Sequence, residues 1–577
     1  MADCEEVILK LKNLFVQGEQ ITLETYLNKK GIDNYRKYLK PPTSVLDDCY
    51  LYDNIHEAVN EIKYHILENH RFCLVIDSDT DGYTSAYVMY KYIKLQNPKC
   101  KVHMIVQDGK IRGLDSAFIR NKILEYEPDC LILTDSGTNS APYEETLLEA
   151  NIPLICIDHH DATEDICKHS IIVNNRLNNF ECNTELSGCG VTFKVVQALD
   201  KEFGTKYSNR FIDLVGLSII SDSMDVRTYE NRWFIKYILD DKEHIENPFI
   251  YELFDRFLGD TYTQRDISFR IVPLINSVIR CGTTEDKQQL FLAFDGKKID
   301  ETIEMCTHYH QEQVQKRDKF IEHHQDEIDE QADSNITIID AKDIPQNFSG
   351  LIAGKISGDT NKPCIVGKTT DGELGGSFRG YIPIDTMREL PSVTFAQGHN
   401  MGAYGIRLKT QNLDDFRTEI DKMDISIDRE VIASYSANKL QMGLFEEFVG
   451  HNDLWGKELD KPTFHVYNVR VNNEDIKVLG DKQNTLKIEL DGYTIMFFKM
   501  TEQNINEFGI SFGEVMDDKT KKREVIYNNK ELSIDIIGTL DINKYENKYT
   551  HRTTVTNQII VDDFEIKVIE NSFEDLM

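Results

Sequence analysis

The sequence predicts a multidomain α/β protein that ends in an all-β unit, and three observations support this prediction. Between Phe72 and Ile157, short apolar runs alternate with helical patterns, which is typical of a parallel sheet covered by helices. The alternation returns in a smaller unit from Ile336 onward. Residues 462–570 then consist of β-branched and aromatic runs with polar alternation. At 577 residues, the chain is long enough for three or four domains.

Before the sheet region, the sequence favours helices. Apolar residues have helical spacing in Ile8–Phe15 and in Ala58–Leu67, and Pro41-Pro42 separates the two segments. The sheet region itself predicts strands at Cys73–Ile76, Lys101–Val106, Leu131–Thr134 and Leu154–Ile157, with helices at Ala117–Glu125 and Tyr143–Ala150.

The first of these strands stops at three carboxylates on alternate residues, Asp77, Asp79 and Asp81, and Gly82 then opens a helical pattern. In an extended segment, alternate spacing places all three on one face, where they repel one another unless a divalent ion or protons neutralise them. An EF-hand calcium loop fits poorly, because its twelfth position is Val88 instead of Glu and a strand precedes it. An acidic solvated turn is the remaining alternative for this segment alone.

Acidic residues recur where later apolar segments end. Three such endings are Asp135-Ser136-Gly137 after Leu131–Thr134, Asp158-His159-His160-Asp161 after Leu154–Ile157, and Ser221-Asp222-Ser223 after Phe211–Ile220. The carboxyl ends of parallel strands share one edge of a sheet, so four segments would deliver Asp or His to one place. Each could be a helix N-cap, but independent capping explains four together poorly.

Aspartates with one or two imidazoles suit Mn²⁺ or Mg²⁺ better than a closed structural zinc site, which favours thiolates. The carboxylates are numerous enough for two ions bridged by a shared ligand. Two ions ~3.5–4 Å apart activate water at neutral pH and hold both oxygens of an in-line displacement at phosphorus. The sequence therefore predicts phosphoester hydrolysis.

The charge and composition of the chain limit which ligands and which cellular compartment we expect. A net charge of −33 opposes indiscriminate binding to polyanions, although a local basic channel or bound metal can reverse the potential at one place. The twelve cysteines include no CxxC pair and several lie in apolar runs, as expected for free thiols in a reducing cytoplasm. No signal peptide opens the chain, and no apolar run reaches the roughly eighteen residues of a membrane helix.

These motifs resemble, in the same order, the four motifs of the DHH phosphoesterases: DSDTDG, Asp135-Ser136-Gly137, Asp158-His159-His160 and Ser221-Asp222. Other stretches between about residues 39 and 280, among them LSGCGVTFK and DISFRIVPLINSVIR, are similar to the RecJ single-strand DNA exonucleases. One departure is QDGKIRGL (107–114), where the family has an Arg before a Gly-Tyr-Gly turn. Lys110 and Arg112 are both candidates for that role.

The resemblance implies roles for individual residues. The implied ligands of two Mn²⁺ or Mg²⁺ ions are Asp79, Asp81, Asp135, His159 and Asp222, with Asp135 as the bridge. Asp77 would lie beside the first metal, Asp158 would orient a histidine, and His160 would face the scissile phosphate. Asn276 and Arg280 match a stretch that lines the substrate channel.

Residues 301–333 predict a long linker helix, on which His308, His310, His323 and His324 fit a solvated face better than a metal site. Beyond it, NFSGLIAGKI, GGSFR and QGHNMGAYG are similar to the DHH-associated domain. That resemblance implies close approach of backbone glycines to phosphate, with further contacts from Ser377, Arg379 and His399. The final all-β unit looks like the oligonucleotide-binding fold of RecJ.

The expected domains are a catalytic DHH domain with an N-terminal helical segment (1–300), the linker helix (301–335), the DHH-associated domain (336–425), and a connecting helix with the oligonucleotide-binding-type β domain (426–577). The resemblance implies a metal-dependent 5′→3′ exonuclease that converts single-stranded DNA to mononucleotides in DNA repair, recombination or replication. The all-β unit argues against the alternative of a nano-RNase or other small-phosphoester hydrolase. The intact acidic motifs argue against a non-catalytic replication scaffold.

We expect single-stranded DNA as the substrate partner, with a single-strand-binding protein or a helicase as candidate protein partners. We also expect a monomer that does not bind membranes. Its expected location is the cytoplasm of a bacterial cell, or the host cytoplasm if a virus encodes it.

Overall fold

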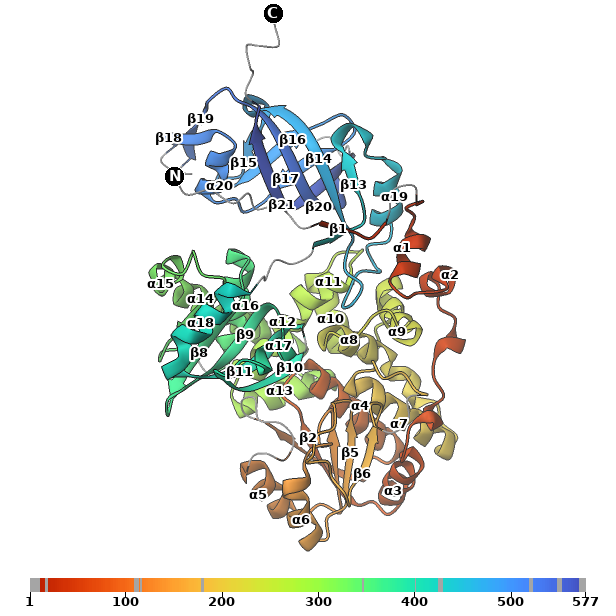
Figure 1. The fold of residues 1–577 in the computed structure, drawn as a ribbon. Helices are drawn as coiled ribbons and strands as arrows, with labels where there is room; N and C mark the ends of the chain where they lie inside the picture. The colour runs from red at the N-terminus through yellow and green to blue at the C-terminus, as the bar shows by residue number, and fades with distance from the viewer. Residues whose placement is uncertain are drawn as a thin grey trace, which may run out of the picture. The chain divides into compact units, whose positions relative to one another are not determined.

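The computed structural model describes residues 11–15, 19–107, 114, 117–177, 181–344, 347–399, 401–423, 429–517, 522–546 and 553–569. The chain divides into two compact units (Figure 1). One is Lys40–Ile427, and the other combines Met1–Leu39 with Asp428–Met577. Within the described ranges, no helix has both the length and the apolar character that crossing a membrane requires.

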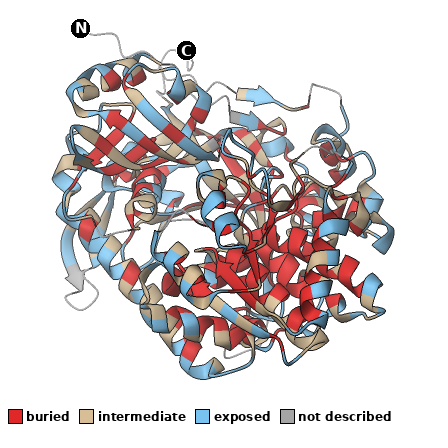
Figure 2. Ribbon diagram, turned by 90° about the horizontal axis from the view of Figure 1, so that it is seen from below, coloured by how far each residue is buried: buried red, intermediate tan, exposed pale blue. Residues whose placement is uncertain are grey.

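The Lys40–Ile427 unit contains the predicted parallel sheet. Its five strands have the order β3-β2-β4-β5-β6, and every neighbouring pair is parallel. The strands are β2 (Arg71–Ile76), β3 (Lys101–Val106), β4 (Cys130–Thr134), β5 (Leu154–Asp158) and β6 (Ile171–Asn174). Strands β4 and β5 are buried throughout, as expected for a parallel sheet with both faces covered (Figure 2).

Helices cover this sheet and extend beyond it. They include α3 (Ile55–Leu67), α4 (Thr80–Gln96), α5 (Ala117–Tyr126), α6 (Ala141–Glu149), α7 (Gly188–Phe203), α8 (Ile212–Ser221), α9 (Tyr229–Asp240), α10 (Pro248–Phe257), α12 (Val272–Cys281) and α13 (Thr284–Phe294). The apolar run Phe211–Ile220 thus forms most of a helix instead of a strand, and α8 packs against α4, α7 and α9. A short, wholly apolar run does not distinguish a buried strand from a buried helix.

The linker region is helical, as predicted, and it leads into a second sheet. Helix α14 (Ile299–His323) is followed by α15 (Gln325–Asp329). The five strands of the second sheet have the order β10-β11-β9-β8-β7. They are β7 (Thr337–Asp340), β8 (Cys364–Thr370), β9 (Glu373–Pro383), β10 (Val393–His399) and β11 (Met401–Lys409), accompanied by α16 (Ser349–Thr360), α17 (Ile384–Arg388) and α18 (Leu413–Lys422). Phe320 and Ile328 of the linker share a hydrophobic core with Ile339 of β7 and Ile352 of α16.

The second unit joins the two ends of the chain. Strand β1 (Leu11–Asn13) pairs in parallel with β12 (Arg429–Val431). Tyr26 of α1 (Leu23–Lys29) packs edge-on against Phe448 and Trp455. The predicted helix at Ile8–Phe15 is therefore wrong in its described part, because pairing with a distant strand outweighs the local helical spacing of the apolar residues.

The rest of this unit is the predicted all-β region. A seven-stranded sheet has the order β13-β14-β20-β21-β17-β16-β15, and a separate hairpin pairs β18 with β19. The strands are β13 (Ser434–Ser436), β14 (Thr463–Asn472), β15 (Lys477–Leu479), β16 (Thr485–Glu489), β17 (Thr494–Phe497), β18 (Ile510–Asp517), β19 (Lys522–Tyr527), β20 (Glu531–Glu546) and β21 (Thr553–Val568), with the short helices α19 (Gly443–Val449) and α20 (Glu502–Glu507).

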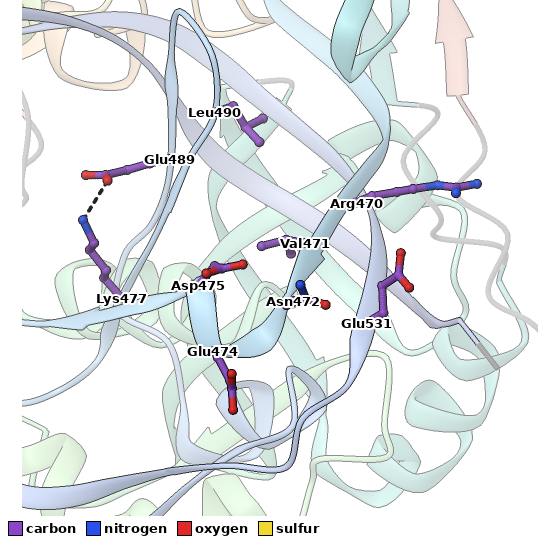
Figure 3. A pocket seen from close by; sticks show the side chains of 9 residues that line it. All are labelled: Arg470, Val471, Asn472, Glu474, Asp475, Lys477, Glu489, Leu490 and Glu531. Carbon is purple, nitrogen blue, oxygen red and sulfur yellow. Dashed lines mark hydrogen bonds and ion pairs between the residues drawn. The ribbon is translucent and has the colours of Figure 1, made fainter. Parts of the chain in front are cut away.

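A cavity of about 510 Å³ lies in this β unit (Figure 3). Four carboxylates line it, those of Glu474, Asp475, Glu489 and Glu531, together with the cations Arg470 and Lys477. Lys477 is already paired with Glu489 at 2.7 Å. The lining is therefore acidic, and it does not suit a nucleic-acid backbone.

Candidate active site

The turn from β2 into α4 carries the three alternate aspartates. Asp79 caps α4, because its carboxylate accepts the backbone N–H of Gly82 at 3.0 Å. A Cβ atom added at Gly82 would lie 2.7 Å from both the Cβ and the carbonyl oxygen of Asp77. Glycine is therefore required for the helix to start this close to the strand end. Asp77 and Asp81 are buried, whereas Asp79 is half-buried.

Asp81 is fixed by the start of α7. Its carboxylate accepts the backbone N–H groups of Gly188 and Cys189, both at 2.8 Å, and a hydrogen bond from the Ser218 hydroxyl. Burial and the charge of Asp79 nevertheless raise the pKa of Asp81 to about 6. The N-terminus of α7 stabilises the Asp81 carboxylate and holds it in place. Because the pKa is still raised, these hydrogen bonds do not fully offset the cost of burying the negative charge.

Asp135 follows β4 in a left-handed backbone conformation, with φ of +61°, and its N–H donates to the carbonyl of Ile157 at 2.8 Å. Its side chain is buried, and the Oδ1 atom has no hydrogen-bond partner among the described residues. A Cβ atom at Gly188 would lie 2.4 Å from this oxygen. Burial and the charge of Asp81 raise the pKa of Asp135 well above its ordinary value. A buried carboxylate in this position requires a cation or a proton.

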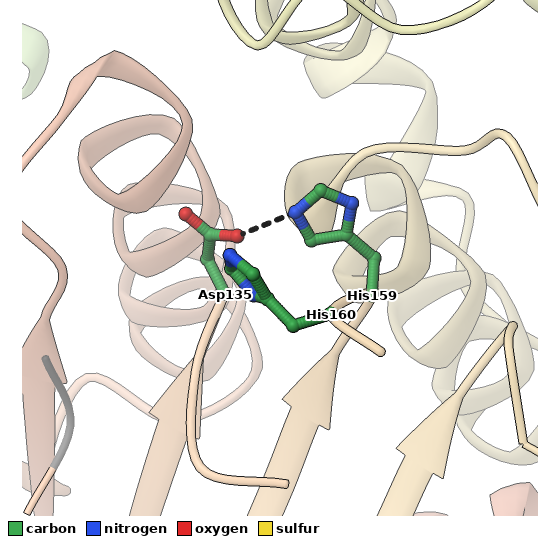
Figure 4. Close-up of side chains that lie close together, drawn as sticks. All are labelled: Asp135, His159 and His160. Carbon is green, nitrogen blue, oxygen red and sulfur yellow. Dashed lines mark ion pairs between the residues drawn. The ribbon is translucent and has the colours of Figure 1, made fainter. Parts of the chain in front are cut away.

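His159 connects the acidic residues. Its Nε2 atom lies 3.2 Å from Asp135 Oδ1, 3.4 Å from Asp222 Oδ2 and 3.9 Å from Asp81 Oδ2. Figure 4 shows the His159 ring directed at Asp135 above the ends of the strands. Asp222 reaches this cluster from the C-terminal end of α8, so its approach differs from the strand ending that the sequence suggested.

Asp158 and His160 form a second contact at the same edge. Asp158 is buried, and its Oδ1 atom lies 2.8 Å from Nδ1 of His160, whose side chain is 33% exposed. Burial alone would raise the pKa of Asp158, but the adjacent His160 and the hydrogen bonds to the carboxylate hold the pKa far below its ordinary value. Asp158 is therefore an anion that orients His160 toward the accessible side of the cluster.

Three overlapping sets of residues could hold metal ions. In each set, one ligand atom per residue lies within 4.8 Å of the others: Asp77, Asp79 and Asp135; Asp81, His159 and Asp222; Asp135, His159 and His160. Asp135 belongs to two sets, and its buried oxygen lacks a hydrogen-bond donor among the described residues. Carboxylates with one or two imidazoles match the ligand preferences of Mn²⁺ and Mg²⁺. The residues therefore fit a site for hard divalent ions.

The structure brings all eight predicted acidic and histidine residues of the four motifs to one edge of the first sheet. The sequence pattern does not reveal the groups that hold Asp81, namely the first amides of α7 and the Ser218 hydroxyl. Ser187 caps α7 through the N–H of Gly190. A Ser followed by glycines before an apolar helix is the local signal that could have indicated this anion-binding helix start.

The predicted substrate residues lie on α12 and on the second sheet. The carboxamide oxygen of Asn276 accepts the hydroxyl of Thr80 at 2.9 Å, which places α12 beside the first motif. Arg280 follows on the same helix, and the carboxamide of Asn347 donates to its carbonyl at 3.5 Å. Burial lowers the pKa of Arg379, and the positive charge of Arg280 adds to this decrease.

Arg379 of β9 lies against the start of α16. A Cβ atom at Gly350 would be 2.6 Å from its Nη2 atom, and the hydroxyls of Ser349 and Ser377 are 2.9 Å apart beside it. His399 lies in β10, but its side chain is outside the described residues, as are Lys110 and Arg112. Within the described part of the unit, neither Arg280 nor Arg379 forms an ion pair.

Comparisons with known proteins agree with this arrangement. Residues 71–219 match the DHH family, N-terminal domain, and residues 433–557 match the RecJ OB domain. A Bacillus subtilis (strain 168) protein named as an SPbeta prophage-derived single-strand DNA-specific exonuclease, YorK, is 26% identical over 96% of this chain and 97% of its own. The single-stranded-DNA-specific exonuclease RecJ of the same organism is 22% identical over 90% of this chain and 66% of its own.

The fold has a counterpart among solved structures. The crystal structure of RecJ in complex with Mn²⁺ from Thermus thermophilus matches with a TM-score of 0.70 and 17% identity, over 94% of this chain and 76% of that chain. The parallel sheet and its acidic edge lie mainly within the DHH match, and most of the terminal β unit lies within the RecJ OB match. These family matches and the relatives named as single-strand DNA exonucleases confirm the resemblance to the RecJ-like DHH phosphoesterases that the sequence indicates.

Proposed function

We propose that this protein is a metal-dependent 5′→3′ exonuclease that hydrolyses single-stranded DNA to mononucleotides, in DNA repair, recombination or replication. The observation that carries the proposal is the buried Oδ1 atom of Asp135, which lies 3.2 Å from Nε2 of His159 in an aspartate and histidine cluster but accepts no well-aligned hydrogen bond from the described residues. Such a cluster suits divalent cations and the hydrolysis of phosphoesters. The relatives named as single-strand DNA exonucleases support the substrate class.

Two Mn²⁺ or Mg²⁺ ions would be held by the cluster. The proposed ligands are Asp79, Asp81, Asp135, His159 and Asp222, with Asp135 shared and Asp77 adjacent. When bound, such ions neutralise charge on a phosphate and increase the acidity of water, so that a nucleophile is available near neutral pH. The protein prepares these positions by fixing Asp81 with the amides of α7.

His160 would contact the phosphate that is cleaved. Its Nδ1 atom is engaged by Asp158, so Nε2 is the ring atom that would reach a substrate. The contact between Nδ1 and Asp158 holds the ring so that Nε2 is the atom directed away from the carboxylate, toward a phosphate oxygen of the substrate. The partial exposure of His160 is consistent with this role, because Asp158 itself is buried.

Arg280, Arg379 and Ser377 would bind the end of the strand. Two neighbouring guanidinium groups without ion pairs in the described part of the unit favour an anion between them. Gly350 has no side chain, so Arg379 can lie against α16. The hydroxyl of Ser349, the first residue of α16, contacts the hydroxyl of Ser377. The carboxamide nitrogen of Asn276 is a further donor, because its oxygen already accepts from Thr80. A terminal 5′-phosphate bound here beside the metal cluster would define the polarity and the release of single nucleotides.

The direct test is cleavage of single strands labelled at the 5′ or the 3′ end, with Mn²⁺, Mg²⁺ or EDTA. We expect a 5′ label to appear at once as mononucleotide, a 3′ label to remain on shortening strands, and EDTA to abolish both. Cleavage restricted to dinucleotides would instead indicate a small-phosphoester hydrolase. Absence of cleavage with either ion would indicate a non-catalytic role.

A further inference from the structure

A second cluster of metal-ligating side chains lies outside the active site, where the linker helix ends. His323 is the last residue of α14, His324 lies between α14 and α15, and Asp343 follows β7 by three residues. One ligand atom from each lies within 4.8 Å of the others. The sequence suggested that these histidines belong to a solvated helix face. It did not indicate that Asp343 lies beside them, because the contact joins two different elements.

His324 is held in an orientation suited to metal binding. Its Nδ1 atom is 2.9 Å from the carboxylate of Glu327, and its ring packs on Phe320 with 4.4 Å between centroids. Phe320 is itself buried in the core between the linker and the second sheet. The carboxylate fixes Nδ1 as the protonated nitrogen, which leaves the lone pair of Nε2 available. Such a carboxylate behind a histidine is the usual outer partner of a metal ligand.

The remaining ligand positions lie around the Nε2 atom of His324. This atom is 3.7 Å from Asp343 Oδ1, close enough for both to contact one ion after a small adjustment of side chains. The side chain of His324 is largely shielded, whereas His323 and Asp343 are exposed, so an ion can enter from solvent. The C-terminal end of a long helix also favours positive charge, and α14 has 25 residues.

We propose that His323, His324 and Asp343 bind one divalent transition-metal ion of the Zn²⁺ class, with Glu327 orienting His324. Two imidazoles and one carboxylate form a softer ligand set than the aspartate-rich active site, and they leave a fourth position for water. The ion would connect the end of α14 to the segment that follows β7. It would thereby stabilise the junction between the linker helix and the second sheet, without contacting the reacting phosphate.

The test uses the full-length, metal-free protein with Co²⁺ as a spectroscopic probe in the presence of excess Mg²⁺. His323→Ala and Asp343→Asn each remove one ligand, and His308→Ala removes a histidine from the same helix outside the cluster. All variants retain the active-site residues, so any Co²⁺ bound there is common to every sample. Thermal unfolding of the metal-free samples establishes that each variant is folded.

We expect wild type and His308→Ala to bind one more Co²⁺ per chain than the two cluster variants, with a visible absorption band that the variants lack. Zn²⁺ should also raise the unfolding temperature of wild type by more than it raises that of Asp343→Asn, because a ligand that binds only the folded state stabilises it. Equal Co²⁺ stoichiometry and equal Zn²⁺ shifts in all four proteins would overturn the proposal.

Discussion

The Nδ1 atom of His160 lies 2.8 Å from the Oδ1 atom of Asp158, and the same carboxylate accepts backbone N–H groups from Thr138, His159 and His160. The buried carboxylate of Asp158 therefore fixes both the backbone that follows β5 and the ring of His160. Only the ring has access to solvent, so Asp158 can act on a substrate only through its neighbours.

This relationship predicts how substitutions at the two positions combine. Asp158→Asn keeps the shape of the side chain but removes the negative charge that holds the His160 ring, and we expect turnover to fall ~10–100-fold. His160→Ala should reduce turnover at least as much. The double variant should then be no slower than His160→Ala alone, because the two residues act as one unit. The measurement is kcat on a 5′-labelled single strand, and multiplicative losses would show that Asp158 has a separate role.

Asp135 should be the most sensitive position of the cluster. Asp135→Asn retains the volume of the side chain but removes the negative charge of a residue that belongs to two of the candidate metal-ligand sets. We expect turnover to fall by several orders of magnitude and the stabilisation by Mn²⁺ to be largely lost, because the bridging ligand is weakened. Activity assays and thermal unfolding with and without Mn²⁺ measure the two effects. Near-normal activity with Mn²⁺ would exclude the proposed bridging role.

The same carboxylates predict a pH dependence of stability in EDTA. Burial raises the pKa of Asp81 to about 6 and raises that of Asp135 as well, so the folded state retains protons that the unfolded state has released. Stability should therefore decrease as the pH rises from about 4, the ordinary Asp value, through about 6. Saturating Mn²⁺ should remove much of this decrease, because the ions replace the protons.

Thermal unfolding across this pH range measures the effect, and Asp135→Asn provides the comparison. The variant lacks one of the carboxylates whose pKa is raised, so its unfolding temperature in EDTA should depend less steeply on pH. It should also be more stable than wild type near pH 7, by ~2–4 °C for each kcal/mol relieved. Parallel curves for the two proteins would mean that folding does not raise the pKa of Asp135 in the metal-free protein.

The sequence was sufficient to predict the aspartates at the strand ends, because alternate carboxylates after an apolar run are a local pattern. It could not predict what holds them. Asp81 is fixed by Gly188 and by Ser218, which are 107 and 137 residues away along the chain. Asp222 lies in the cluster, 3.4 Å from Nε2 of His159, but the preceding apolar run has a length that suits either a strand or a helix.

Contacts between distant segments also explain the other differences between the predicted and the observed structure. The first described residues form a strand because β12, more than 400 positions later, supplies its hydrogen-bonding partner. Likewise, His323 and His324 resemble an ordinary polar helix face until the segment after β7 brings Asp343 beside them. A residue pattern reveals the periodicity of a single helix or strand. Each of these two contacts joins separate elements, so the pattern could not predict it.

Arg379 should distinguish strands that begin with a 5′-phosphate from strands that begin with a 5′-hydroxyl. Lys in its place keeps the charge but cannot make a bidentate contact with phosphate. Arg379→Lys should therefore reduce cleavage of 5′-phosphorylated strands ~10-fold or more, as expected for a lost charge-assisted hydrogen bond. Cleavage of 5′-hydroxyl strands should change less. Arg388→Lys is a matched control, because Arg388 lies on α17 and bonds to Asp385 and to the carbonyl of Ala396. Equal losses on both strands would indicate a structural role for Arg379.

The final prediction concerns the unit formed by the two ends of the chain. The active-site cluster, Arg280 and Arg379 all lie within Lys40–Ile427, whereas the RecJ OB domain match lies in the other unit. A fragment that ends near Leu454 would keep Tyr26 and Phe448 but lose Trp455 and the β sheet of the same unit, so the cut is better made at both unit boundaries. We therefore expect a Lys40–Ile427 fragment to fold and to cleave very short oligonucleotides at a rate near that of the full chain.

On long strands, the fragment should bind more weakly than the full chain, because stacking on an oligonucleotide-binding surface contributes ~1–3 kcal/mol per base. The affinity of the fragment should also fall less steeply with salt, since fewer phosphates are neutralised. Fluorescence anisotropy on strands of increasing length, at several salt concentrations, measures both effects. If a folded fragment bound and degraded long strands as well as the full chain, the β unit would not extend the DNA-binding surface, and its acidic cavity would point instead to a protein partner with basic side chains.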